Sequence, residues 1–160
     1  DILNTWSEED LNELFKVYGE IRSPYRVVRA VVHDRKEEPY QTTQQFSSLV
    51  ERVDRWKKKG RHPATQYFLA LRLFVNQELQ QTKQCLAPFI QALKPGGVFV
   101  VLTFHSLEDR IVKIAFKEAQ DQGLGRRLNK KVIVADEDEQ KENPRARSAK
   151  LRAFQKQVEE

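Results

Sequence analysis

The chain has little cysteine and no long apolar run, and these two shortages exclude several classes of protein. A single cysteine, Cys85, stands among 160 residues, which excludes an internal disulfide framework and a cysteine-rich zinc site and suits a reducing compartment. With Leu86, Phe89 and Ile90 nearby, Cys85 is predicted to be a small buried hydrophobe. No apolar stretch approaches the roughly 20 residues that span a bilayer. We therefore expect a soluble protein with no membrane partner.

Glycine is also scarce, with six residues in the chain. A loop that cradles a phosphate or an adenosyl group needs glycines between a strand and a helix, so that backbone approaches the ligand closely. Gly96 and Gly97 instead precede a predicted strand, and Gly123 and Gly125 follow a helical stretch. We therefore expect no cofactor-binding residues in this chain. We also expect no metal site, because the three histidines are far apart in sequence and have no matched ligands.

Positive charge exceeds negative charge. The chain has 28 Lys and Arg against 23 Asp and Glu, a net charge of +5 and a sequence pI near 9.4. Part of this charge is concentrated in one short segment, which holds Lys57, Lys58, Lys59, Arg61 and His62. Such a patch is the electrostatic footprint of a protein that binds a polyanion, above all a nucleic acid. A solvated loop without a partner is the alternative.

The most informative segment follows a helix end and the turn at residues 95–97. Residues 98–103 form an unbroken apolar run with no polar alternation, which is typical of a parallel strand covered by helices on both faces. Ligands of open α/β sheets bind beyond the carboxyl ends of such strands. His105, Ser106, Glu108 and Asp109 occupy that place. Ser106 and Asp109 also match a helix-capping pattern, and Glu108, Asp109 and Arg110 are candidates for local ion pairs.

The rest of the chain predicts helices first and short strands later. Amphipathic helices are expected after Ser7, from about Pro24 and from Thr42 or Thr43, then from His62, and over 81–94 with Pro88 as a kink or start. A helix over 107–120 follows the strand. Residues 131–135 and 149–154 are strand candidates, 136–142 an acidic loop, and 121–129 the most mobile segment. This is an α/β chain with a helical unit at 1–75 and a second part at 76–160.

Several motifs in order give the chain a family resemblance. They cover residues 4–9, 18–20, 62–65, 70–76, 104–113 and 143–152. The chain resembles the small-subunit ribosomal RNA cytosine-N4 methyltransferase family, which methylates a cytidine of the decoding region with S-adenosylmethionine. Gln66 and Ile21 depart from the family pattern, and the segment between Val53 and Arg61 is shorter than usual.

The resemblance implies a fold that is only partly present. It corresponds to the later half of a Rossmann-like class I methyltransferase fold with an RNA-binding α-helical insert at residues 1–75, and S-adenosylmethionine is expected to bind mainly to the absent N-terminal half. The implied activity is rRNA methylation at cytidine N4. The alternative is a catalytically inactive, methyltransferase-like ribosome assembly factor that binds ribosomal RNA. The compartment is the cytoplasm for a bacterial protein, and the mitochondrion or plastid for a eukaryotic one.

The resemblance also assigns roles to residues. His105 and Ser106 are the candidate catalytic residues, and His105 is expected to contact the target cytosine or orient its amine, with a turn-shaping role as the alternative. Small-subunit ribosomal RNA, or an assembling small subunit, is the expected partner. Homo-oligomers and ribosome assembly factors stay open as further partners. The expected RNA-binding residues are Lys57, Lys58, Lys59, Arg61, His62, Thr65, Arg72, Arg145 and Arg147; a structural role is the alternative for Arg72, Arg145 and Arg147.

Overall fold

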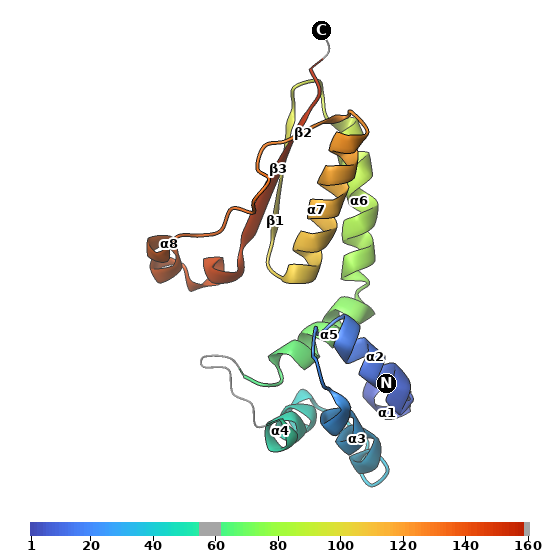
Figure 1. Cartoon of the computed structure of the whole chain (residues 1–160). Helices are drawn as coiled ribbons and strands as arrows, with labels where there is room; N and C mark the ends of the chain where they lie inside the picture. Colours follow the sequence, from blue (N-terminus) through green and yellow to red (C-terminus); the bar gives the residue numbers. More distant parts are fainter. Residues whose placement is uncertain (55–61, 159–160) are drawn as a thin grey trace. The chain divides into compact units, whose positions relative to one another are not determined.

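The computed structural model describes residues 1–54 and 62–158, and it divides the chain into two compact units (Figure 1). The first unit is Asp1–Gln77 and the second is Glu78–Glu160. Together they make a mixed α/β chain. No helix among the described residues is long and apolar enough to cross a membrane.

The first unit is helical, and two of its helices, α2 and α4, begin at the capping residues that the sequence predicts. Ser7 caps α2 by accepting a hydrogen bond from the Asp10 N–H, and Thr42 forms a complete capping box with Gln45 at the start of α4. The predicted helix from His62 begins slightly later, at Thr65. The described helices are α1 (Ile2–Thr5), α2 (Glu8–Val17), α3 (Tyr25–Asp34), α4 (Thr43–Val53) and α5 (Thr65–Val75).

An aromatic cluster forms the core of the first unit. The rings of Phe15, Phe46 and Tyr67 are buried, with centroids 4.9 to 6.1 Å apart. Edge-to-face pairs of this kind add stability beyond the apolar area they bury. The Tyr67 hydroxyl faces the Asp54 carboxylate at 3.4 Å, and burial, reinforced by that negative charge, raises the pKa of Tyr67. The helices therefore pack around a well-defined core.

The second unit contains a three-stranded antiparallel sheet in the order β1-β3-β2. Val98 pairs with Gln155 and Thr103 with Lys150, so the last strand lies beside the apolar run. The elements are α6 (Glu78–Ala92), β1 (Val98–Thr103), α7 (Ser106–Asp121), β2 (Gly125–Arg127), α8 (Glu137–Glu142), the 3-10 helix η1 (Pro144–Ser148) and β3 (Lys150–Lys156). The predicted strand at 98–104, the helix at 107–120 and the final strand are confirmed.

One face of the sheet is covered by α6 and α7, which run side by side in Figure 1. Leu86 and Ile90 of α6, Val112 and Phe116 of α7 and Phe154 of β3 form this core. On β1 the alternate side chains of Val98, Val100 and Leu102 are 47 to 52% exposed. The prediction of a parallel strand covered on both faces is therefore wrong for the described residues, in which β1 pairs antiparallel with β3 and has one covered face.

Two local predictions were also wrong. Residues 136–142 were expected to be a loop, yet α8 forms because Asp136 caps it and three acidic residues occupy its first turn, where the helix dipole favours negative charge. Residues 131–135 contribute only an isolated bridge, between Ile133 and Leu151. In the segment at 121–129, residues Gly125–Arg127 form β2, which pairs with β3, and the mobility expected of this segment stays a prediction. Pro88 lies inside α6 and does not start it.

Candidate functional site

His105 ends β1 and caps α7. Its backbone is extended, and its Nδ1 accepts a hydrogen bond from the Glu108 N–H at 3.3 Å. The Glu108 carboxylate in turn accepts from the Phe104 N–H at 3.2 Å. The predicted Ser106–Asp109 cap is therefore wrong, because the helix begins one residue earlier and His105 takes the capping role.

This capping bond fixes how the imidazole presents itself. A neutral ring has one acceptor nitrogen and one N–H, so Nδ1 as acceptor leaves the proton on Nε2. Nε2 is buried, lies 3.3 Å from a Glu108 carboxylate oxygen, and has no hydrogen bond of good geometry. In this orientation the Nε2–H of His105 is a hydrogen-bond donor that lies next to the Glu108 carboxylate.

Glu78, at the start of α6, brings a second carboxylate to this place. Ligand-capable atoms of Glu78, His105 and Glu108 all lie within 4.8 Å of one another. Sequence reasoning missed this group because Glu78 is distant along the chain. A metal on His105 would need the lone pair of Nε2, while the capping bond places the proton there. With the proton on Nε2, the three side chains form a compact polar cluster of one N–H donor and two carboxyl groups.

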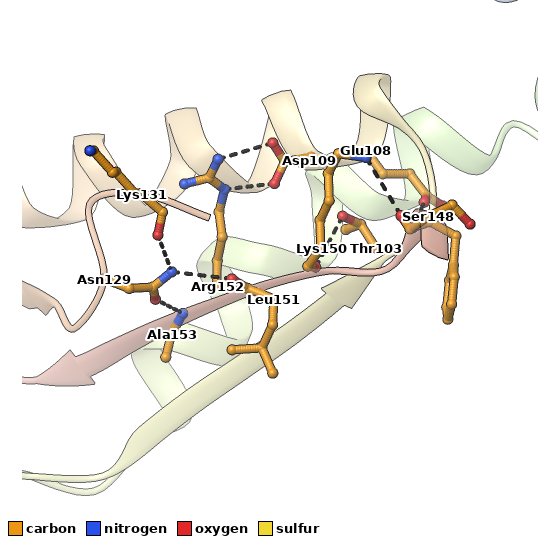
Figure 2. Close-up of polar contacts among 11 residues, drawn as sticks. Thr103, Glu108, Asp109, Asn129, Lys131, Ser148, Lys150, Leu151, Arg152 and Ala153 are labelled. Carbon is orange, nitrogen blue, oxygen red and sulfur yellow. Dashed lines mark hydrogen bonds and ion pairs between the residues drawn. The ribbon is translucent and has the colours of Figure 1, made fainter. Parts of the chain in front are cut away.

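Asp109 and Arg152 form a buried bidentate ion pair (Figure 2). The Arg152 Nε and Nη2 donate to the two carboxylate oxygens of Asp109 at 2.7 and 2.9 Å, and the side chains are only 8 and 15% exposed. The prediction of local ion pairs on α7 did not foresee this partner. The pair ties the first turn of α7 to the middle of β3, so the candidate site has a rigid base.

Near this ion pair, the Asn129 side chain forms hydrogen bonds with the backbone of β3 (Figure 2). Its amide donates to the carbonyls of Lys131 and Leu151 at 2.8 and 3.1 Å, and its oxygen accepts from the Ala153 N–H at 2.7 Å. The Thr103 hydroxyl donates to the Lys150 carbonyl at 3.4 Å. These bonds hold the segment after β2 against β3 and fix the end of β1.

Of the candidate residues in the second unit, several are accessible. Ser106 is exposed at the first position of α7. Arg145 and Arg147 are exposed on η1, which Asn143 caps and which leads into β3. The structure therefore places two exposed cations on the 3-10 helix that precedes β3, while His105 is largely covered.

The first unit holds the other described candidates. His62 is engaged at both nitrogens, by Glu51 at 2.8 Å and by the Ala64 N–H at 3.1 Å. Thr65 and Arg72 are exposed on α5. Lys57, Lys58, Lys59 and Arg61 lie outside the described residues.

Comparison with known proteins identifies the family. The MraW methylase family matches residues 1–157. The chain belongs to this family. The resemblance seen in the sequence is thereby confirmed, and the match is nearly end to end.

Three similar curated proteins carry the same name. The chain is 52% identical over 159 residues to "Ribosomal RNA small subunit methyltransferase H" of Bdellovibrio bacteriovorus, covering 99% of this chain and 48% of the relative. Proteins of the same name from Synechocystis and Bradyrhizobium diazoefficiens are 46 and 45% identical, covering 98% of this chain and 50 and 52% of their own lengths. The chain thus spans about half the length of the curated relatives it matches.

Proposed function

We propose that the full-length protein containing this chain methylates N4 of a cytidine in small-subunit ribosomal RNA. The observation that carries the proposal is the end-to-end family match together with relatives named as small-subunit ribosomal RNA methyltransferases. The relatives reported above are bacterial. We accordingly propose the bacterial cytoplasm as the compartment.

The proposed cofactor is S-adenosylmethionine, which supplies an electrophilic methyl group when it is bound. The glycines of the described residues do not form a cradle for it, since Gly96 and Gly97 precede β1 and Gly123 and Gly125 flank the start of β2. We therefore assign cofactor binding mainly to the other half of the full-length protein, and we derive no step of the reaction through it.

The proposed contribution of this chain is to bind and position the RNA. The cytidine amine must aim its lone pair at the methyl carbon, and it loses a proton as the new N–C bond forms, so orientation is the main requirement. We propose that His105 and Ser106 border the base. His105 would meet it as an Nε2–H donor, which requires the Glu108 carboxylate to turn away. Ser106 is exposed at the first position of α7.

The remaining candidate residues are proposed phosphate contacts. Arg145 and Arg147 on η1, with Thr65 and Arg72 on α5, are exposed. Such contacts fix the register of an RNA without reading its sequence. We extend the same proposal to His62 and to Lys57, Lys58, Lys59 and Arg61.

We also propose that this chain is the later half of a Rossmann-like methyltransferase fold. Two features of β1 support it: the strand is at the edge of the sheet, and Val98, Val100 and Leu102 expose apolar side chains. Exposed apolar faces and open strand edges are usually covered by a partner. In this proposal another part of the full-length protein covers both.

The fold proposal is tested by Val100→Asp. In the chain alone the substitution should change the free energy of unfolding little, because Val100 is 52% exposed. In the full-length protein it should destabilise by about 2 kcal/mol or more, because a charge is then buried without a partner. Thermal or urea unfolding of both proteins measures this. Equally small changes in the free energy of unfolding of both proteins would contradict the proposal. Lys83→Ala, at an exposed position of α6, is the control substitution.

The activity is tested on the full-length protein with S-adenosylmethionine and small-subunit RNA. Calorimetry should show cofactor binding, and mass spectrometry of nuclease-digested RNA should show N4-methylcytidine. Salt-dependent RNA binding without cofactor binding or methylation would favour the inactive assembly factor. Methylation at a different base or position would overturn the assignment of the target.

A further inference from the structure

A groove in the first unit lies on the exposed face of α3, apart from every residue assigned above. Its volume is about 680 Å³, and α3 forms most of it. Tyr25, Arg26, Arg29 and His33 line it, and Val53 at the end of α4 forms part of the wall. The groove therefore combines an aromatic ring with basic side chains around an apolar floor.

Helical spacing explains why these side chains share one face. Positions 26, 29 and 33 follow the three and four residue spacing of neighbours on a helix surface. The opposite face of α3 buries Val27, Val28 and Val31 in the core of the first unit. Arg26 and His33 are seven residues apart, a rise of about 10 Å, which matches about three stacked nucleotides.

The charge of the groove is available for an anion. Arg26 forms no ion pair within the described part of the chain, and Arg29 makes one contact of 4.0 Å to Glu8 while its side chain is 80% exposed. The acidic residue in the lining is Asp34, whose carboxylate is already engaged by Arg52 and His33. The groove thus presents two arginines with little competition from carboxylates.

Tyr25 supplies a surface for a base. It is 46% exposed, so part of its ring is accessible to a ligand. The Lys16 ammonium lies 4.3 Å from the centroid of its ring and contacts its hydroxyl, which holds the ring in place and adds positive charge beside the groove. An aromatic ring next to arginines is the combination that binds single-stranded nucleic acid.

We propose that this groove binds a single-stranded segment of the RNA substrate, with phosphates on Arg26 and Arg29 and a base on Tyr25. The proposal rests on the proposed function for its choice of polymer. It adds a binding surface that the sequence motifs do not include.

The test measures binding of the full-length protein to a single-stranded RNA of ~20 nucleotides that contains the target cytidine. The double variant Arg26→Ala/Arg29→Ala should weaken binding about tenfold or more, and lower the slope of log affinity against log salt by about 1.4, the loss expected for two single-strand phosphates. Tyr25→Ala should weaken binding about fivefold or more, while Tyr25→Phe should retain it, because both rings stack on a base.

Two controls separate this surface from general charge and folding effects. Lys83→Ala removes an exposed cation from α6 and should leave affinity within twofold of the wild type. Arg26→Lys/Arg29→Lys keeps both charges and should largely retain the salt slope. Wild-type affinity and slope in the alanine double variant, or an equal loss in Tyr25→Ala and Tyr25→Phe, would overturn the groove.

Failure of the groove and failure of the proposed function give different results. If the wild type methylates RNA but the alanine variants bind it normally, only the groove is wrong. If the variants lose RNA binding while the wild type methylates nothing, the groove stands and the enzyme proposal falls. If the wild type binds no RNA at all, both fall together.

Discussion

The Asp109 carboxylate accepts two hydrogen bonds from the Arg152 guanidinium, at 2.7 and 2.9 Å, and joins α7 to β3. These residues are 43 positions apart in sequence, and their side chains are 8 and 15% exposed. The bidentate geometry suits a guanidinium and cannot be reproduced by lysine. Because His105 begins the same helix, the pair also fixes the position of the candidate site.

Asp109→Ala should destabilise the chain by about 3 to 5 kcal/mol, because it leaves the buried Arg152 charge without a partner. The free energy of unfolding from urea titration measures the loss. Replacement of both residues by leucine should cost much less than the sum of the single changes, since no charge is then left buried. Additive losses would show that the two side chains act independently.

Gly125→Ala should disrupt the pairing of β2 with β3. A Cβ at Gly125 would lie 2.0 Å from the Gln155 carbonyl oxygen and 2.8 Å from the Phe154 ring, so the two strands would have to separate. Gly123→Ala is the matched control: its Cβ would meet no atom within 4 Å, and its cost is the strain of φ +75°, about 1 kcal/mol. The Leu128 amide donates to the Ala153 carbonyl of β3 at 2.9 Å, and its hydrogen exchange should rise in the first variant only. Equal protection in both variants would contradict the prediction.

The Asp34 ion pairs should stabilise the first unit in a pH-dependent manner. The hydrogen bond from His33, together with the bond and charge of Arg52, lowers the pKa of Asp34 below its ordinary 3.8. The stabilisation is therefore complete above about pH 4 and is lost as the pH falls through the lower folded-state value. Asp34→Asn should lower stability at pH 7 by no more than about 1 kcal/mol, because the pairs are exposed. At pH 2 the variant and the wild type should be equally stable, as acid and urea titrations will show.

Local signals in the sequence predicted much of the fold. Ser7 and Thr42 form their caps through atoms only three residues away, and the run at 98–103 carries enough apolar β-branched side chains to define a strand. The prediction of a loop at 136–142 was wrong because the Asp136 cap and the helix dipole, which each stabilise a helix only slightly, together outweighed the low helix preference inferred from the charged composition.

The candidate site was harder to predict because its geometry is set by distant partners. Arg152 belongs to β3, in which apolar and basic residues are mixed, and nothing near it in the sequence indicates that it pairs with Asp109 rather than with RNA. Glu78 approaches His105 only because α6 and α7 pack together. β1 shows the same limit: its apolar run predicts cover on both faces, yet Val98, Val100 and Leu102 are exposed on one face of the strand.

Substitution of His105 separates its capping role from its proposed role at the base. Asparagine is a strong helix cap, so His105→Asn should retain the bond from the Glu108 N–H and leave stability within about 1 kcal/mol of the wild type. It lacks the Nε2–H, and single-turnover methylation by the full-length protein should therefore slow at least about tenfold with RNA affinity unchanged. His105→Ala should lose the cap as well and destabilise by about 0.5 to 2 kcal/mol. Full activity in the asparagine variant, together with reduced stability in the alanine variant, would show that His105 acts only as a capping residue. Ser106 would then be the remaining candidate for contact with the base.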